Sequence, residues 1–263
     1  MGDERRRYLI QQMELGGSEV ILERGAAARA AAAASTAPPP TPESPAQAAP
    51  KWKKGAPPIP GPGLTVEPPA LSLLAGDPLA DLESLEAVAE RIRACERCAL
   101  CAGRTNAVPG EGNPRAGLVF VGEGPGATED ATGRPFVGQA GKLLDDIIAA
   151  IGLRREDVYI ANVVKCRPPQ NRTPLPDETA ACMPFLRRQL ALLGPRVIVA
   201  LGATAAAALL DTRKSLGELR GKVHTYGGIP LVVTYHPAAL LRNPNWKKPA
   251  WDDVRIARQL LDR

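Results

Sequence analysis

The regular alternation of short apolar runs with amphipathic segments, from about residue 118 onward, constrains the fold most strongly. Continuous apolar runs at 118–122, 158–166 and 196–202 predict strands that are buried on both faces. The segments 138–152, 176–193 and 203–210 have the period and length of helices. Two more strand-like runs, 222–226 and 230–237, precede a terminal helix from about Pro249. The pattern predicts an α/β fold, a three-layer αβα sandwich with a central four-stranded parallel sheet.

The ends of the predicted strands indicate where a site should lie. In open parallel sheets, ligands bind at the carboxyl ends of the strands. The loops at those ends begin at Gly122, Asn162, Gly202 and His236. We therefore expect side chains from these four loops to meet at one edge of the sheet.

The N-terminal third has a different composition. Residues 1–16 have apolar side chains at helical spacing and predict an amphipathic helix, which either docks on a protein partner or is a tail without function. Residues 17–78 are rich in Ala and Pro, and the stretch from Pro38 to Pro69 holds 12 of the 27 prolines. Such a segment buries too little apolar surface to offset its ordering entropy. We expect a disordered linker over 17–78 and one folded domain over 79–263.

Charge and hydropathy narrow the class of partner. The formal net charge of +5 and the pI of about 9.1 favour an anionic partner, with nucleic acid the first candidate. No apolar run approaches the ~20 residues of a membrane-spanning helix, and the N-terminus lacks the apolar stretch of a secretory signal. We therefore expect a cytoplasmic protein, a monomer that binds no membrane.

The loop 121–141 combines glycines with carboxylates. Gly122 and Gly124 allow the backbone to approach a ligand closely, while Glu123 adds a carboxylate and Phe136 is one of only three Phe. A plain turn is one alternative, and a dinucleotide site is another. GEGPG is not the GxGxxG fingerprint, however, and Asn162 stands where an acidic residue would end the next strand.

Asn162 and His236 are the polar candidates at two other strand ends. An Asn at a strand end is usually a turn former, but its amide offers both a donor and an acceptor for the edge of a pyrimidine. His236 is one of two histidines and precedes Pro237 and a predicted helix. It is either structural or placed for the cleft. In that helix, Leu240 or Leu241 is either a core residue or a wedge for a base stack.

Five cysteines in a chain without a secretory signal indicate metal binding rather than disulfides. Cys95 and Cys98 form a CxxC, Cys166 ends the second predicted strand, and Cys182 lies in the helix that follows. Four thiolates suit a tetrahedral zinc or a cubane iron–sulfur cluster, and spacing alone does not separate the two. Buried free thiols are the third reading. Cys101 is left over and could compete as a ligand.

Taken together, these segments resemble the family 4 uracil-DNA glycosylases, the iron–sulfur branch of the uracil-DNA glycosylase superfamily. The resemblance covers about residues 92–263. Its motifs are CERC, GEGPGATEDATGRPFVGQAG, YIANVVKCRPPQNRTPLPDE, the later Cys182 and HPAALLRN. Several motifs in the right order are more specific than any one of them.

The resemblance implies a hydrolase that flips uracil out of single- or double-stranded DNA and cleaves its N-glycosidic bond. The abasic site that remains enters base excision repair. It also implies a [4Fe-4S] cluster, mainly structural, on Cys95, Cys98, Cys166 and Cys182.

The same resemblance implies roles for the site residues. Phe136 stacks on the flipped base, Asn162 reads its O4 and N3–H, and His236 stabilises the departing uracil anion. The glycine loop, including Gly122 and Gly124, lines the base. Gly124 replaces the Asp that activates water in the best-known uracil glycosylases, which leaves Glu123 as the nearest carboxylate.

Basic residues near these loops are candidates for gripping DNA phosphates: Lys165, Arg167, Arg172 and Arg242, with Arg220 and Lys222 beside them. Three alternative functions remain open. One is a glycosylase with a broader range of deaminated bases, another is a non-catalytic metal-stabilised DNA-binding module, and the third is a nucleotide-binding enzyme that uses the glycine loop.

Overall fold

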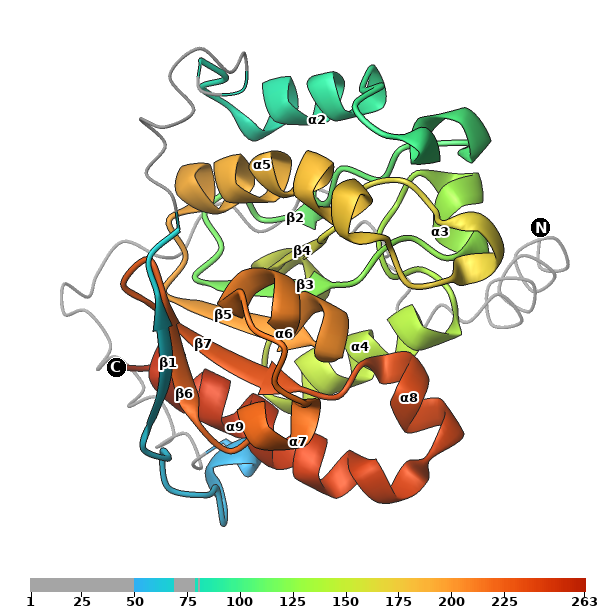
Figure 1. The fold of residues 1–263 in the computed structure, drawn as a ribbon. Coiled ribbons are helices and arrows are strands. Elements are labelled where there is room, and N and C mark those ends of the chain that lie inside the picture. The colour runs from blue at the N-terminus through green and yellow to red at the C-terminus, as the bar shows by residue number, and fades with distance from the viewer. Residues whose placement is uncertain (1–49, 69–78, 80) are drawn as a thin grey trace, which may run out of the picture. The chain divides into compact units, whose positions relative to one another are not determined.

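A parallel sheet of four strands forms the centre of the protein. The computed structural model describes residues 50–68, 79 and 81–263. In it the four central strands are parallel, in the spatial order β7-β5-β3-β4 (Figure 1). They are β3 (Leu118–Gly122), β4 (Tyr159–Asn162), β5 (Val197–Leu201) and β7 (Ile229–Thr234). The predicted four-stranded parallel sheet is confirmed.

Three further strands widen this sheet at its edges. β6 (Val223–Tyr226) runs antiparallel to β7, β1 (Pro62–Val66) runs parallel to β6, and β2 (Glu111–Gly112) runs antiparallel to β4. The described sheet therefore has seven strands in the order β1-β6-β7-β5-β3-β4-β2. The run at 222–226 was expected as a strand, whereas β1 and β2 were not.

Part of the predicted linker is ordered, so the prediction of disorder over 17–78 is wrong for residues 50–68. Within these residues, Trp52 in η1 (Lys51–Lys53) is only 3% exposed, and β1 adds a strand to the sheet. The main-chain N–H of Leu64 donates to Nδ1 of His224 at 2.9 Å. Pro62 is tolerated because it is the first residue of an edge strand. The predicted helix 1–16 and the rest of the linker lie outside the described residues.

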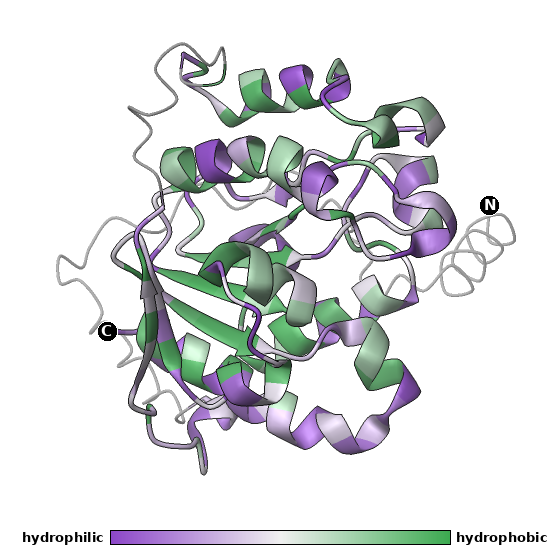
Figure 2. Ribbon diagram, in the orientation of Figure 1, coloured by the Kyte–Doolittle hydropathy of each residue, from purple (hydrophilic) through white to green (hydrophobic). Residues whose placement is uncertain are grey.

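Alternate residues of each central strand enter two separate cores, as expected for a sheet covered on both faces. Val119 and Val121 of β3 pack with α2 (Leu85–Arg93), α5 (Pro176–Leu193) and α6 (Ala203–Leu210). Leu118 and Phe120 pack on the other face with α4 (Gln139–Ala150) and α9 (Lys247–Leu261). Figure 2 shows the strands as the most hydrophobic layer, between these helices. The αβα sandwich is confirmed.

Short helices occupy the connections between the longer elements. They are α3 (Ala127–Thr132), α7 (Leu216–Leu219), α8 (Pro237–Arg242), η3 (Ala99–Gly103), η4 (Arg155–Asp157), η5 (Pro169–Asn171) and η6 (Pro244–Trp246). α3 and α8 lie beside the strand ends that carry the predicted site (Figure 1). Among the described helices, none has the length and apolar character that a membrane span requires.

Candidate functional site

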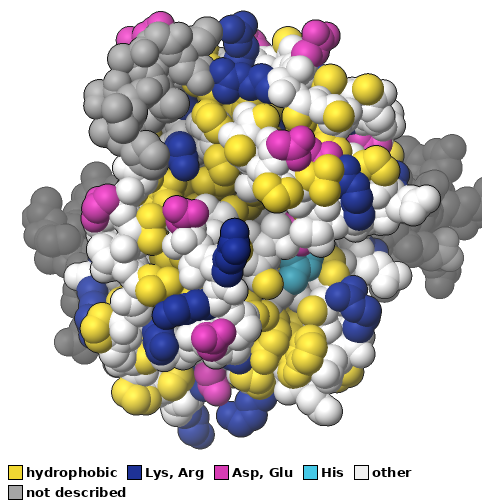
Figure 3. Space-filling model, viewed as in Figure 1, with side chains coloured by type: hydrophobic (Ala, Val, Ile, Leu, Met, Phe, Trp, Pro, Cys, Tyr) yellow, Lys and Arg dark blue, Asp and Glu magenta, His cyan; other side chains and the backbone are white. Residues whose placement is uncertain are grey.

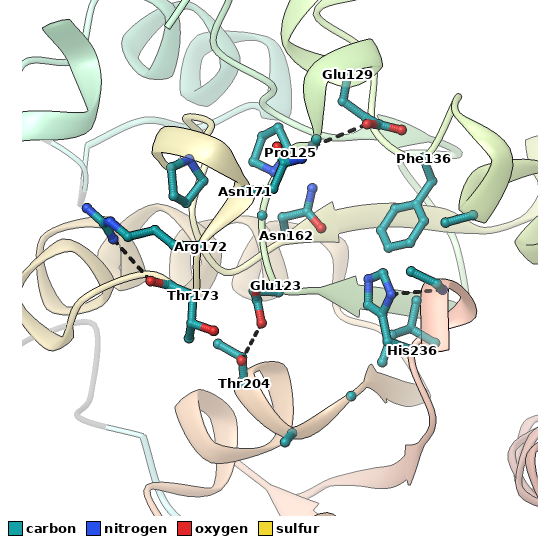
Figure 4. A pocket seen from close by; sticks show the side chains of 18 of the residues that line it. Glu123, Pro125, Glu129, Phe136, Asn162, Asn171, Arg172, Thr173, Thr204 and His236 are labelled. Atoms are coloured by element: carbon teal, nitrogen blue, oxygen red, sulfur yellow. Dashed lines mark hydrogen bonds between the residues drawn. The ribbon is translucent and has the colours of Figure 1, made fainter. Parts of the chain in front are cut away.

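A pocket of about 510 Å³ lies at the carboxyl ends of the parallel strands, the expected place for a ligand in such a sheet. All four predicted loops contribute to it. Register explains part of this, since Gly122 of β3 pairs directly with Asn162 of β4. The lining residues that were predicted are Glu123, Gly124, Phe136, Asn162, Gly202 and His236. Figure 4 shows the Phe136, Asn162 and His236 side chains around the same hollow.

Asn162 presents an unpaired acceptor to this pocket. The residue is 1% exposed, and its Oδ1 has no hydrogen-bond partner among the described residues. A buried polar atom without a partner is costly, which makes it a candidate for ligand binding. Gly122 leaves the space that Asn162 needs. A Cβ at Gly122 would lie 2.5 Å from Asn162 Oδ1 and 2.5 Å from Phe136 Cζ.

Phe136 is held in a strained conformation. Its φ of 49° falls in the left-handed region, which is unfavourable for a bulky residue. The Glu129 carboxylate accepts the N–H groups of Val137 and Gly138, both at 2.9 Å. The Arg155 guanidinium donates to the carbonyl of Phe136 at 3.0 Å. Arg155 also donates to the carbonyl of Pro135 at 2.5 Å, so these contacts fix the backbone on both sides of Phe136 and determine where its ring lies.

His236 faces Phe136 and begins helix α8. The two rings are 5.5 Å apart, centroid to centroid. The Nδ1 atom of His236 accepts the N–H of Ala238 at 3.1 Å, so the proton of the neutral ring resides on Nε2. Burial, with a further contribution from the positive charge of Arg242, lowers the pKa of His236 to about 4. The imidazole is therefore a neutral donor at physiological pH.

Glu123 lies on the other side of Asn162 and is tied to helix α6. Its carboxylate accepts a short hydrogen bond from the Thr204 hydroxyl, drawn in Figure 4. Gly124 lines the pocket beside it, and a Cβ there would lie 2.7 Å from Val164 Cγ2. Glu123 is thus oriented by a neighbour and faces the space where a ligand would lie.

Lys165 does not belong to a DNA-binding surface, and that prediction is wrong. The side chain is 1% exposed, and its Nζ donates to the main-chain oxygen of Asn162 at 2.8 Å and to Gln189 Oε1 at 2.7 Å. Burial lowers the pKa of Lys165 to about 8, against the opposing effect of Cys182. The sequence gives no sign of this, because Lys165 lies in the loop after β4, where a side chain can turn either outward or inward.

Arg172, Arg167 and Arg242 lie nearer the solvent. Arg172 lines the pocket and donates to the Glu178 carboxylate at 2.8 and 2.6 Å. Arg167 donates from Nε to the side chain of Asn171 at 2.7 Å. Arg242 is exposed, lines the pocket and is the last residue of α8. Figure 3 shows Lys and Arg side chains around the hollow that contains a histidine.

Two other basic candidates are placed differently. The Arg220 side chain is 15% exposed, is paired with Asp253 at 2.7 Å and stacks on Tyr235. Lys222 is exposed but lines a different cavity, near β1 and His224. The structure does not bring these two residues into the pocket.

The structure distinguishes the two roles predicted for the leucines of helix α8, a core residue and a wedge for the base stack. Leu240 is 1% exposed and therefore a core residue. Leu241 is 45% exposed and, with Arg242, belongs to the outer surface of α8. Only Leu241 is available as a wedge.

The five cysteines line a second, smaller cavity, which is separate from the pocket. They come from α5, from the loop after β4 and from the segment that follows α2. The Arg104 guanidinium donates to Cys166 Sγ at 3.2 Å, and the main-chain N–H of Lys165 donates to Cys182 Sγ at 3.3 Å. Burial raises the pKa of Cys182 to about 12. Among the described residues, no three His, Cys, Asp or Glu side chains are placed to share one metal ion.

Sequence reasoning assigned no role to three residues that shape the pocket. Glu129 and Arg155 act on the main chain around Phe136, and a contact of that kind has no sequence signature. Thr204 lies two residues after Gly202, so the rule of strand ends already pointed to its loop.

Comparison with known proteins identifies the family. The fold and the pocket define an α/β protein whose site lies at the carboxyl edge of a parallel sheet. Residues 109–255 match the family model of the uracil DNA glycosylase superfamily. A type-4 uracil-DNA glycosylase from Thermotoga maritima is 55% identical over 185 residues, which is 69% of this chain and 96% of the relative. The chain belongs to the uracil-DNA glycosylase superfamily, with type-4 enzymes among its relatives.

Two further relatives show how the similarity is distributed. A type-4 uracil-DNA glycosylase from Saccharolobus solfataricus is 46% identical over 189 residues, 68% of this chain and 88% of the relative. A type-5 uracil-DNA glycosylase from Thermus thermophilus is 38% identical over 149 residues, 49% of this chain and 68% of the relative. This chain thus shares more of its length with the type-4 relatives than with this type-5 relative.

Proposed function

We propose that this protein is a uracil-DNA glycosylase, which flips uracil out of DNA and hydrolyses its N-glycosidic bond. The single observation that supports this most is the meeting of Phe136, Asn162 and His236 in one pocket. They are an aromatic face, an amide and a neutral imidazole donor. A pyrimidine extruded from the helix requires these groups, because its ring stacks while its edge forms hydrogen bonds.

Asn162 reads the base. Its unpaired Oδ1 accepts the N3–H of uracil, while its amide nitrogen donates to O4. Cytosine presents the reverse polarity at both positions, so it would leave buried donors and acceptors facing the wrong partners. Phe136 stacks on the ring, and Gly122 leaves the space in which the ring and the amide come together.

His236 stabilises the leaving group. Cleavage places negative charge on the uracil, and the Nε2–H of His236 donates a hydrogen bond to O2 where that charge develops. A preorganised donor of this kind contributes ~3–4 kcal/mol to the transition state. The hydrogen bond from Ala238 to Nδ1 provides the preorganisation, because it leaves Nε2 as the donor.

Glu123 positions the attacking water. Its carboxylate is oriented by Thr204 and faces the pocket, as Figure 4 shows. The sugar acquires oxocarbenium character as the bond breaks, so a held water suffices and a strong base is not required. Gly124 provides the open backbone on this side of the pocket.

The rim of the pocket binds the DNA strand. Arg242 lines the pocket and Arg167 is next to the lining residue Pro168, and both pair with phosphates, as does Arg172, which forms an ion pair with Glu178. Leu241 on α8 enters the base stack in place of the extruded uracil. Phosphate contacts of this kind fix the register of the protein on DNA without reading sequence.

The cysteine cavity holds a [4Fe-4S] cluster on Cys95, Cys98, Cys166 and Cys182. A zinc ion requires four sulfurs at about 2.3 Å from one atom, whereas each corner iron of a cubane takes one thiolate. The four proposed ligands line one cavity, and two of their sulfurs accept hydrogen bonds, from Arg104 and from the main chain of Lys165, as the sulfurs of a bound cluster would. When bound, the cluster cross-links α5, the β4 loop and the segment after α2. Purified protein should be brown and contain iron, and a colourless zinc protein would contradict the assignment.

The remaining proposals concern the setting of the enzyme. Residues 79–263 together with residues 50–68 form the catalytic domain. The protein acts as a cytoplasmic monomer. Residues 1–16 are proposed to bind a protein partner. Gel filtration of the full chain, with and without uracil-containing DNA, tests the monomer.

The experiment that tests the function is uracil release by the intact protein beside a His236→Ala variant. Single- and double-stranded oligonucleotides with one uracil should acquire an alkali-sensitive abasic site, and the variant should be slower by ~10²–10³-fold. Parallel substrates with hypoxanthine and cytosine measure the range of bases. A folded, iron-loaded wild-type protein that releases uracil from neither strand form would exclude the proposed function.

A further inference from the structure

Lys165 is a buried cation without an acidic partner in the described part of the chain. It is one of the largest fully buried side chains, and no described ion pair includes it. The acceptors of its Nζ are two neutral oxygens, one on the main chain of Asn162 and one on the Gln189 side chain. A buried charge is normally paired, since its desolvation is otherwise uncompensated. This arrangement therefore calls for a compensating negative charge nearby.

The cysteine cavity is the nearest source of that charge. Lys165 lines this cavity together with the cysteines, and its own main-chain N–H donates to Cys182 Sγ at 3.3 Å. Cys166 is the next residue in the chain. An iron–sulfur cluster held by four thiolates has a net negative charge, and nearby hydrogen bonds and charges stabilise it.

The other end of the same short segment lies in the uracil pocket. The main-chain N–H of Val163 donates to Gly122 at 2.9 Å, which extends the pairing of β3 with β4 up to Asn162. The Lys165 side chain then folds back to the Asn162 carbonyl at 2.8 Å. Gln189, the second acceptor, is itself fixed because its amide donates to Pro109 O at 2.8 Å. The short segment 162–166 thus connects the pocket to the cavity.

We propose that Lys165 is a positioning residue that couples the loaded cysteine cavity to the base-reading amide of Asn162. Its ammonium group balances the charge of the thiolate-bound cluster and holds the Asn162 carbonyl in place. This inference rests on the proposed function. It assigns the cluster an influence on the rate of uracil release, whereas a cross-link alone would influence only stability.

Lys165 matters because small displacements of Asn162 would weaken its contacts with the base. A binding group must be held within about 0.5 Å of its productive geometry, and residues behind it provide that rigidity. Among the described residues, Asn162 Oδ1 has no hydrogen-bond partner that would hold it before the base arrives. The orientation of its amide therefore depends on its backbone, which Lys165 fixes.

Lys165→Met tests the proposal, because Met retains the apolar length and removes the donors. Lys142→Met, at an exposed position on α4, is the matched control. For each full-length variant we would measure iron content, melting temperature, the single-turnover rate on uracil-containing DNA and the affinity for undamaged DNA. Lys165→Met should lower the rate by about 10–100-fold while retaining most of its iron and its affinity for undamaged DNA, and Lys165→Arg should restore part of the rate.

A double variant separates positioning from simple core packing. If Lys165 acts through Asn162, adding Lys165→Met to Asn162→Ala should cost no further rate. The inference would be overturned if the losses of rate in the two single variants multiplied in the double variant. It would also be overturned if an iron-loaded Lys165→Met protein released uracil at the wild-type rate. Should Lys165→Met fail to fold, Gln189→Leu removes one partner of the ammonium, and the same criteria apply to it. A wild-type protein without uracil release would refute the proposed function itself, which distinguishes the two failures.

Discussion

The pocket proposed to bind uracil and the cysteine cavity are built in opposite ways. The pocket forms where four parallel strands end, so the sheet itself brings its residues together. The cavity lies outside the sheet, between α2, α5 and the β4 loop, and its cysteines span residues 95–182. The pocket therefore depends on the topology of the core, whereas we propose that the cavity depends on a cluster bound by its thiols. Substitutions in the pocket should alter catalysis, and substitutions in the cavity should alter stability first.

The largest effect is expected from the cavity. Cys166→Ala removes a proposed ligand that is 6% exposed, so the protein should lose iron and several kcal/mol of stability, about 10 °C in melting temperature. Iron analysis and thermal unfolding measure both. Cys101→Ala is the control, since it should keep iron and melting temperature. A Cys166→Ala protein with full iron content would remove this cysteine from the ligand set.

Asn162→Asp tests whether the pocket reads uracil. A carboxylate accepts N3–H but repels O4, so the rate of uracil release should fall by about 10³-fold while DNA affinity and melting temperature stay near wild type. Asn113→Asp is the control, because its side chain accepts the Arg115 N–H at 2.9 Å, and an Asp retains that contact. Unchanged selectivity between uracil and cytosine would show that Asn162 does not read the base.

Gly122→Ala tests the convergence of the ring and the amide. The new methyl would lie 2.5 Å from both Phe136 Cζ and Asn162 Oδ1, and a displacement of about 1 Å at such groups costs ~10²-fold in rate. Single-turnover kinetics report it. Gly61→Ala is the control and should leave the rate unchanged, because a Cβ there meets nothing within 4 Å. Equal rates for the two variants would contradict the geometry described for the pocket.

The smallest effect concerns pH. Because the pKa of His236 lies near 4, the ring stays neutral and the rate should change less than about twofold between pH 5.5 and 7. Protonation at lower pH would place a hydrogen on Nδ1, against the Ala238 N–H, and the rate should fall. The His236 contribution to stability is present above the unfolded pKa of about 6.5 and is lost as pH falls from there towards 4. A rate that titrates with a midpoint near pH 6.5 would indicate an exposed imidazole.

Much of the fold could be predicted from the sequence because the core is strongly patterned. The predicted bounds of β3, α5 and α6 agree with the structure, since continuous apolar runs and Gly termini delimit them. β1 was missed because its partner strand, β6, is about 160 residues away and its own segment is rich in Pro. Strand pairing between segments so far apart in the sequence leaves no local pattern from which β1 could be predicted.

The candidate site was predictable where it follows from strand ends, and not where it depends on side-chain direction. The positions of Asn162 and His236 came from that rule, together with the resemblance to a known family. The burial of Lys165 could not be read from the sequence, because a lysine after a strand can turn either outward or back into the core. The conformation of Phe136 was also hidden, since its left-handed φ depends on Glu129 and Arg155.

The hydrogen bond between Ala238 and His236 ties the ring that we propose to be catalytic to the first turn of its own helix. Because it fixes the hydrogen of the neutral imidazole on Nε2 before any substrate arrives, the proposed reaction requires no proton relay through His236. Uracil can depart as an anion and collect its hydrogen later from bulk water. Bond cleavage measured in heavy water should then show almost no solvent isotope effect.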